Sequence, residues 1–159
     1  MVLQNYKITK AQEASQAPLS QRFLHDLSWR YSNRWDSKRW PNFSIGELAC
    51  RHCGESYIDY DFLDRLQALR NTLEKPLYIL SAHRCAHHNA MIGGAPLSQH
   101  LKLAVDISLY NHDRFGLASQ ARSLGFTGFG YYSTFLHIDI GRSRHWYGGQ
   151  KAKDLWQQP

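Results

Sequence analysis

Two short segments of this sequence together offer a histidine, aspartate and histidine set of metal ligands. Residues 98–106 carry His100 and Asp106 six residues apart and run into an apolar stretch. Residues 135–139 place His137 inside a second apolar run. A catalytic zinc site uses three protein ligands of these types and leaves its fourth position open for water. The residue types therefore predict a zinc centre at His100, Asp106 and His137.

The elements that would position this centre follow from apolar spacing and turn residues. Helical spacing predicts helices over residues 19–31 and 59–73. Ser44, with Glu47 three residues later, forms a capping box for a short helix. A further helix is predicted over residues 113–123. Strands are predicted over residues 77–81, 104–109, 128–132 and 135–140, the last two forming a hairpin.

This order of elements predicts an α+β fold, with a small antiparallel-rich sheet packed by helices. Residues 42–148 would form the main domain. Residues 1–41 are interpreted as an N-terminal extension with a helix, and residues 149–159 as a polar tail.

The length, apolar content and net charge of the chain limit which kinds of protein it can be. The chain has 159 residues, a length typical of one domain, and no apolar run approaches the ~20 residues of a membrane span. Its amino terminus lacks the charged-then-apolar pattern of a secretory signal. The net charge of +6 favours anionic partners such as nucleic acid or cell-wall polymer. No RNA-binding signature or zinc-finger spacing is present, so no specific nucleic-acid partner is expected. The sequence indicates no oligomeric state.

The three cysteines are Cys50, Cys53 and Cys85. The first two form a C-x-x-C pair, which is found in structural zinc sites and in redox pairs. A structural zinc site needs four ligands, and His52, Cys85 or a neighbouring histidine could complete one. The sequence alone favours the simpler interpretation of one disulfide or three buried thiols.

Several motifs occur in a shared order between residues 81 and 139. They are Ser81-Ala82-His83-Arg84-Cys85, His88-Asn89, Gly93-Gly94-Ala95, Ser98-x-His100, Ala104-x-Asp106, Gly128-x-Gly130-x-Tyr132 and Phe135-x-His137-x-Asp139. This order resembles peptidase family M15, which contains zinc D-Ala-D-Ala carboxypeptidases and related peptidoglycan-cleaving enzymes. The resemblance covers about residues 43–146.

The resemblance implies a zinc-peptidase fold of the D-Ala-D-Ala carboxypeptidase and hedgehog type over residues 42–148. It implies one zinc ion per chain, held by His100, Asp106 and His137. Arg84 would bind a substrate carboxylate or polarise the scissile carbonyl, and Ser98 and Tyr132 would contact the substrate. It also implies a peptidoglycan stem peptide as substrate and a location in the cell envelope or periplasm, or in a phage.

Two positions depart from the family pattern. The family usually separates its first histidine from the aspartate by seven steps with an intervening glycine, whereas this chain has six steps and Leu103. Many relatives carry an acidic residue three positions before the last histidine, and Thr134 stands there in this chain. Asp139 shares the strand face of His137, so it is either the catalytic base or a partner that orients the ligand.

The expected function is zinc-dependent hydrolysis of a cell-wall peptide bond by a metal-activated water. Carboxypeptidase and endopeptidase action both fit this expectation. The alternative is a catalytically inactive module of the same fold that binds cell-wall peptide or a protein partner. The shortened spacing between His100 and Asp106 and the missing acidic residue at Thr134 favour that alternative.

Overall fold

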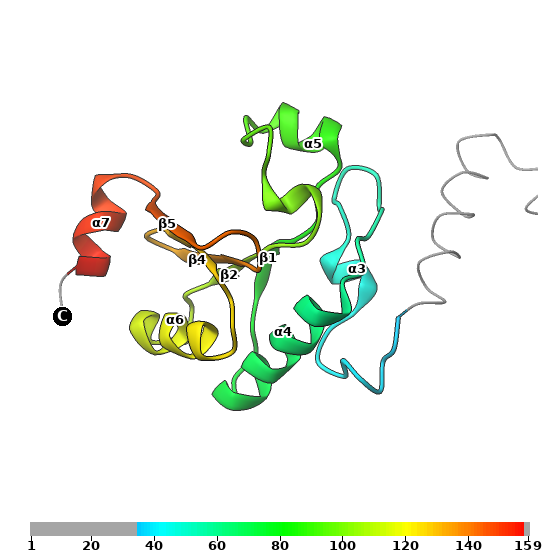
Figure 1. Cartoon of the computed structure of the whole chain (residues 1–159), viewed down its shortest axis with the longest axis horizontal. Coiled ribbons are helices and arrows are strands. Elements are labelled where there is room, and N and C mark those ends of the chain that lie inside the picture. Colours follow the sequence, from blue (N-terminus) through cyan, green and yellow to red (C-terminus); the bar gives the residue numbers. More distant parts are fainter. Residues whose placement is uncertain (1–34, 158–159) are drawn as a thin grey trace, which may run out of the picture.

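The computed structural model describes residues 35–157, in which one sheet is flanked by helices (Figure 1). The five strands lie in the order β1-β2-β4-β3-β5, and all pairs are antiparallel except β3 with β5. Their bounds are β1 (Ile79–Ser81), β2 (Val105–Ser108), β3 (Gly128–Tyr131), β4 (Phe135–Asp139) and β5 (Arg144–Tyr147). The predicted α+β class and antiparallel-rich sheet are confirmed. The helix predicted over residues 19–31 lies outside the described residues.

Three of the helices begin after residues of types that commonly cap helices. The bounds of the helices are α3 (Ile45–Leu48), α4 (Tyr60–Leu73), α5 (Ala86–Met91), α6 (Arg114–Ser123) and α7 (Gln150–Gln157). The side chains of Ser44, Asp59 and Asp113 each accept a backbone N–H at the start of α3, α4 and α6. Within residues 35–157, no helix has both the length and the apolar character needed to cross a bilayer.

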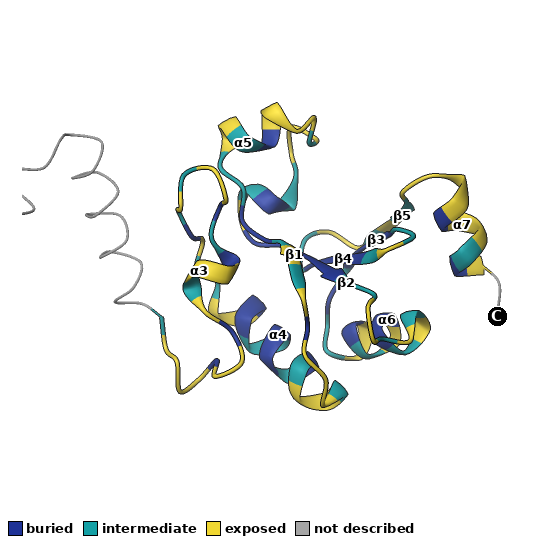
Figure 2. Cartoon of the chain, turned by 180° about the vertical axis from the view of Figure 1, so that it is seen from behind, coloured by how far each residue is buried: buried dark blue, intermediate teal, exposed yellow. Residues whose placement is uncertain are grey.

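The hydrophobic core lies against one face of the sheet. Val105, Ile107, Leu136 and Ile138 alternate along β2 and β4 and are 0% exposed. Figure 1 shows α4 and α6 on one side of the sheet and α5 on the other, and Figure 2 shows the buried residues concentrated in the strands and the inner faces of the helices. Because side chains alternate along a strand, the intervening residues of β2 and β4 face away from this core.

Four elements differ from the sequence-based expectation. Helix α5 and the short 3₁₀ turn η1 (Gln99–Leu101) form between the predicted strands 77–81 and 104–109, where no helix was predicted. Strand β5 forms over residues for which no strand was predicted, because it pairs with β3. Residues 149–159, interpreted as a polar tail, contain α7, which buries Ala152 and Trp156 against the sheet. Tertiary contacts with the other strands, rather than local sequence signals, therefore determine β5 and α7.

Candidate metal centre

The sheet register places two of the predicted ligands side by side. In the antiparallel pair of β2 and β4, Asp106 lies directly opposite His137. Both side chains point to the face away from the core, since their neighbours Val105, Ile107, Leu136 and Ile138 point into it. The third ligand, His100, belongs to η1, which lies just before β2 and turns back over the same face.

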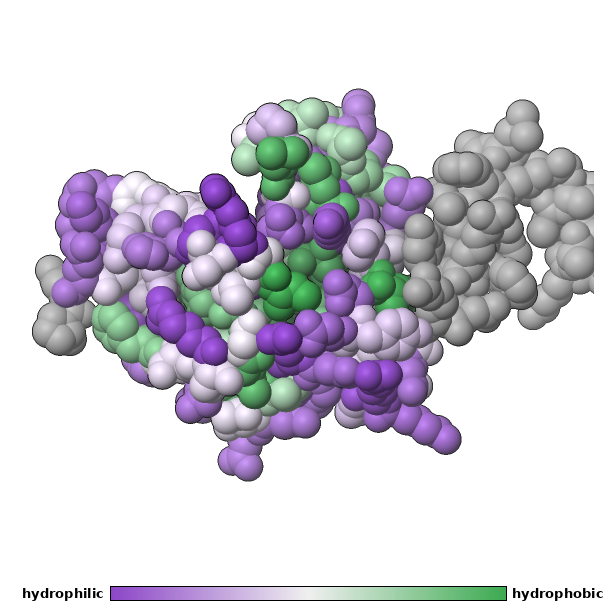
Figure 3. Space-filling view, in the orientation of Figure 1, coloured by the Kyte–Doolittle hydropathy of each residue, from purple (hydrophilic) through white to green (hydrophobic). Residues whose placement is uncertain are grey.

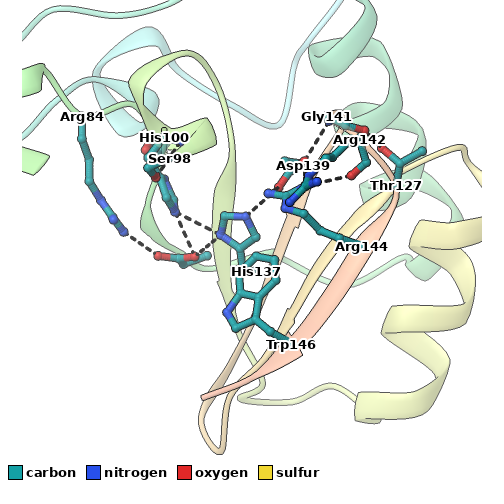
Figure 4. Close-up of polar contacts among 12 residues, drawn as sticks. Arg84, Ser98, His100, Thr127, His137, Asp139, Gly141, Arg142, Arg144 and Trp146 are labelled. Atoms are coloured by element: carbon teal, nitrogen blue, oxygen red, sulfur yellow. Dashed lines mark hydrogen bonds and ion pairs between the residues drawn. The ribbon is translucent and has the colours of Figure 1, made fainter. Parts of the chain in front are cut away.

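The ligand atoms of His100, Asp106 and His137 lie close together, and Figure 4 shows the two imidazoles pointing toward each other. His100 Nε2 lies 3.2 Å from Asp106 Oδ1 and 3.1 Å from His137 Nδ1, and those two atoms are 2.9 Å apart. Ligand atoms around a tetrahedral zinc ion are about 3.3 Å apart, given bonds of about 2.0–2.1 Å. The triangle is therefore slightly tighter than a loaded zinc site and has the right shape for one.

The outer hydrogen bonds of the two imidazoles determine which nitrogen atoms are protonated. His100 Nδ1 is 2.6 Å from the carbonyl oxygen of Ala82, and His137 Nε2 is 2.9 Å from Asp139 Oδ2. Both partners only accept hydrogen bonds, so these two nitrogens carry the protons. Three lone pairs, on His100 Nε2, His137 Nδ1 and Asp106 Oδ1, then face one another. Such a set needs a cation between its members, and a divalent metal fits it.

The short spacing between His100 and Asp106 does not keep them apart. The chain bends at Lys102, which directly follows η1 and has a backbone φ of −108° and ψ of −105°. Leu103 and Ala104 are then buried, and β2 begins at Val105. A tight turn therefore absorbs the missing residue, and its position before the strand leaves the ligand geometry intact.

Asp139 lies behind His137, on the side opposite the ligand triangle. Its side chain is 0% exposed and accepts hydrogen bonds from His137, from the backbone of Gly141 and, through both oxygens, from Arg144. Gly128 makes room for this ion pair, because a Cβ there would lie 2.3 Å from both Asp139 Oδ1 and Arg144 Nη1. These contacts favour orientation of His137 over proton transfer to substrate as the role of Asp139.

A second glycine allows an aromatic side chain to cover His137. Gly130 pairs with His137 on one side and with Trp146 on the other. An added Cβ at Gly130 would lie 2.5 Å from the Trp146 ring, whose centroid is 5.0 Å from that of His137. The Gly128-x-Gly130 motif thus leaves room for the side chains of Asp139, Arg144 and Trp146. Sequence reasoning missed Arg144 and Trp146, although their period-two spacing is typical of a strand.

The other predicted site residues lie around the centre. Arg84 donates through Nη2 to Asp106 Oδ2 at 2.8 Å and through Nε to Ser81 at 2.9 Å. The Ser98 hydroxyl accepts the backbone N–H of His100 at 3.2 Å and so caps η1. The Tyr132 hydroxyl accepts a hydrogen bond from the Trp146 indole at 3.1 Å. All three have contacts that support the centre, and all three also border the cavity beside it.

This cavity has a volume of about 430 Å³ and opens beside the ligand triangle. Figure 3 shows the surface hollowed between the segment that carries α5 and the edge that carries β5. The lining residues are Arg84, Gly93, Gly94, Ala95, Leu97, Ser98, Gln99, His100, Asp106, Tyr132, Phe135, His137, Arg144 and Trp146. A separate cavity of about 230 Å³ between α6, β5 and α7 contains no carboxylate or thiol in its lining. Of these two cavities, the first reaches the predicted ligands.

Burial and neighbouring charges shift the pKa values within the centre in opposite directions. Burial lowers the pKa of His100 and outweighs the attraction of Asp106. Burial also acts to lower the pKa of His137, but Asp106 and Asp139 outweigh it and raise that pKa. Burial would raise the pKa of both carboxyl groups, yet their imidazole partners, with Arg144 at Asp139, hold both well below the usual range. Both carboxylates are therefore ionised at neutral pH.

Comparison with known proteins gives a family match and a set of partial relatives. Residues 41–140 match the family model described as Peptidase M15. The peptidoglycan L,D-endopeptidase MepK of Escherichia coli K12 is 36% identical over 95 residues, which is 55% of this chain and 52% of MepK. MepK of Shigella flexneri matches to the same extent. The chain therefore spans about half the length of the curated relatives it matches.

Proposed function

The chain belongs to the peptidase M15 family, and we propose that it is a zinc-dependent peptidase that cleaves peptide bonds in peptidoglycan. The family and the similarity to MepK support a hydrolase. The observation that carries the proposal is the convergence of three ligand atoms, from His100, Asp106 and His137, beside an open cavity. A peptidoglycan substrate in turn implies a location at the cell envelope.

The donor set fits zinc because it combines two imidazole nitrogens with one carboxylate oxygen. A zinc ion held there would supply a nucleophilic water, with a pKa lowered to about 7, and would polarise the scissile carbonyl. His100, Asp106 and His137 would be the ligands. Their outer partners, the Ala82 carbonyl and the Asp139 carboxylate, fix both imidazoles in the required tautomers.

Arg84 and Arg144 give the cavity a cationic lining that suits a peptide with free carboxylates. Arg84 uses Nε and Nη2 for Ser81 and Asp106, and Arg144 uses both terminal nitrogens for Asp139. Neither guanidinium therefore presents an unoccupied fork to a terminal carboxylate. This favours endopeptidase action, as in the relative MepK, over carboxypeptidase action, which requires such an anchor.

The test is metal content followed by turnover. We expect His100→Ala to contain one zinc ion fewer per chain than the wild type and to release no products from peptidoglycan fragments. Mass spectrometry of digests would distinguish cleavage of cross-linked peptides from removal of a terminal residue. His112→Ala is a matched control, because His112 is a surface residue whose ring bonds the Pro76 carbonyl. If the wild-type protein still contains no zinc after zinc has been added, the proposal is refuted.

One observation favours a second function, the binding of cell-wall peptide without cleavage. Among the described residues that line the cavity, Asp106 is the single carboxylate. It accepts a hydrogen bond from Arg84, and its other oxygen belongs to the ligand triangle with the two imidazoles. The cavity therefore presents no side-chain carboxylate as a general base for the attacking water. Peptidoglycan binding that survives chelation, with no product after long incubation, would establish this function instead.

A further inference from the structure

Three cysteines form a second cluster of possible metal ligands away from the His100 centre. The sulfur atoms of Cys50, Cys53 and Cys85 all lie within 4.8 Å of one another, and all three are free thiols. Cys50 and Cys53 belong to the loop after α3, and Cys85 is the N-cap of α5. Figures 1 and 2 show this loop beside the start of α5. Sulfur atoms around a tetrahedral zinc ion are about 3.8 Å apart.

The backbone around Cys50 is shaped to hold a thiolate. The loop closes through hydrogen bonds from Cys50 N–H to the Glu55 carbonyl and from Gly54 N–H to the Cys50 carbonyl. Gly54 has a φ of +75°, which favours glycine. The backbone N–H of Cys85 then donates to Cys50 Sγ at 3.3 Å. N–H donors aimed at sulfur favour the ionised form, which is the form that binds metals.

Helix α5 carries the candidate for a fourth ligand. His88 Nδ1 lies 3.5 Å from Cys50 Sγ, and the His88 N–H donates to Cys85 Sγ at 3.4 Å. A sulfur and a nitrogen that share a tetrahedral zinc ion are about 3.6 Å apart. His52 Nδ1 is also 3.5 Å from a sulfur, that of Cys85, but His52 is exposed on the loop. His88 is half-buried and shares the first turn of a helix with Cys85, so it is the better placed of the two.

We propose that Cys50, Cys53, Cys85 and His88 bind a second zinc ion with a structural role. The ligands form two pairs with matching spacing, C-x-x-C in the loop and C-x-x-H at the start of α5. Four protein ligands close the coordination shell and leave no position for water, as in structural zinc sites. The proposal does not depend on the peptidase activity, because none of these four residues lines the cavity beside His100.

The second zinc ion would join two segments that support the His100 centre. Cys85 directly follows Arg84, which holds Asp106, and the Arg84 N–H donates to the His100 carbonyl at 2.7 Å. The Ala82 carbonyl, three residues before Cys85, orients the His100 imidazole. The His83 N–H bonds the Leu48 carbonyl at the end of α3. A metal at the cysteines would therefore fix the residues 82–85 on which the ligand geometry of the first centre depends.

The experiment measures metal content and thiolate coordination in the full chain. Purified wild type should contain two zinc ions per chain, and His100→Ala and Cys85→Ser should each contain one. Cobalt substitution should give thiolate-to-cobalt charge-transfer absorption in the wild type and in His100→Ala, and none in Cys85→Ser. His100→Ala keeps all four ligands proposed for the second zinc ion. Its metal content therefore tests the second site even if Cys85→Ser fails to fold.

Two variants test the fourth ligand. His88→Ala should lose the second zinc ion or bind it at least tenfold more weakly, while His52→Ala should retain it. The reverse result would overturn the assignment of His88. Absence of metal from His100→Ala, or an intact mass two hydrogens lighter that identifies a Cys50–Cys53 disulfide, would overturn the second zinc site itself.

Discussion

The two ligand clusters of this chain differ in what surrounds them. His100, Asp106 and His137 offer nitrogen and oxygen atoms, lie on a sheet face and border a cavity of about 430 Å³. The cysteine cluster of Cys50, Cys53 and Cys85 offers sulfur atoms between a loop and a helix end, and none of its members lines that cavity. Three ligands beside open space are typical of a catalytic zinc site, whereas a closed set of four is typical of a structural one.

The difference lies in how each cluster is positioned. The first cluster depends on strand register, since Asp106 and His137 are cross-strand neighbours whose separation the sheet fixes. The second depends on the backbone hydrogen bonds of one loop and the first turn of α5. A binding site built on strands is held more rigidly than one built on loops. We therefore expect the first cluster to keep its shape without metal, and the second to gain order when metal binds.

The largest expected effect comes from His137→Ala. Loss of one ligand and its lone pair should remove the metal of the first cluster and abolish peptidoglycan hydrolysis. The cysteine cluster should still bind metal, which cobalt absorption would report. Loss of both metals in this variant would contradict a separate metal site at the cysteines. His112→Ala, at a surface histidine that bonds the Pro76 carbonyl, should change neither metal content nor activity.

Asp139→Asn should weaken metal binding at the first cluster without affecting the second. Removal of a partner that orients a metal ligand typically costs 10–100-fold in metal affinity or activity. Burial lowers the pKa of His137, and Asp106 and Asp139 raise it with a net increase. Protons therefore compete with metal as the pH falls through this pKa. Loss of the Asp139 charge should move that competition to lower pH, which a metal titration at several pH values would measure.

A base role for Asp139 predicts a different outcome. The variant would then bind metal with unchanged affinity and show only a lower kcat. Asp113→Asn is the matched control, because Asp113 caps α6 and asparagine is an equally good N-cap. This control should leave metal affinity and its pH dependence unchanged.

Much of the fold could be predicted because its signals are local. The apolar stripe of α4, with its cap at Asp59, and the alternation in β2 and β4 identify these elements from the sequence. β5 has no such signal, since it forms by parallel pairing with β3. α5 begins at Cys85, which is not a usual N-cap residue, so its start could not be recognised.

The candidate site was partly predictable for a similar reason. His100, Asp106 and His137 were identified by residue type and spacing, and the structure brings them together. Arg144 and Trp146 were missed because they come from β5 and reach the site only through the two glycines of β3. The sequence offers several histidines as the fourth ligand proposed for the cysteine cluster, and the path of α5 is what favours His88.

Gly130→Ala should disturb the first cluster through packing alone. The new Cβ would lie 2.5 Å from the Trp146 ring and 3.0 Å from His137 Cβ. Overpacking of this kind costs about 1–3 kcal/mol, which denaturant unfolding would measure. Gly46→Ala on α3, where nothing lies within 4 Å of the new Cβ, should be neutral or slightly stabilising. Equal stability of Gly130→Ala and wild type would mean that Trp146 does not pack on His137 as described.

The smallest expected effect is that of Ser98→Ala, which separates support of a ligand from contact with substrate. The Ser98 hydroxyl accepts the His100 N–H at 3.2 Å, so its removal costs about 0.5–1.5 kcal/mol. The hydrogen bond that is lost supports His100 and does not involve the cysteine cluster. Metal affinity should therefore fall a few-fold at the first cluster alone. Ser123→Ala, which removes an exposed hydroxyl bonded to the Gln120 carbonyl, provides the control. A higher KM with unchanged metal affinity would instead identify Ser98 as a substrate contact. It would also mean that η1 keeps His100 in position without the Ser98 hydrogen bond.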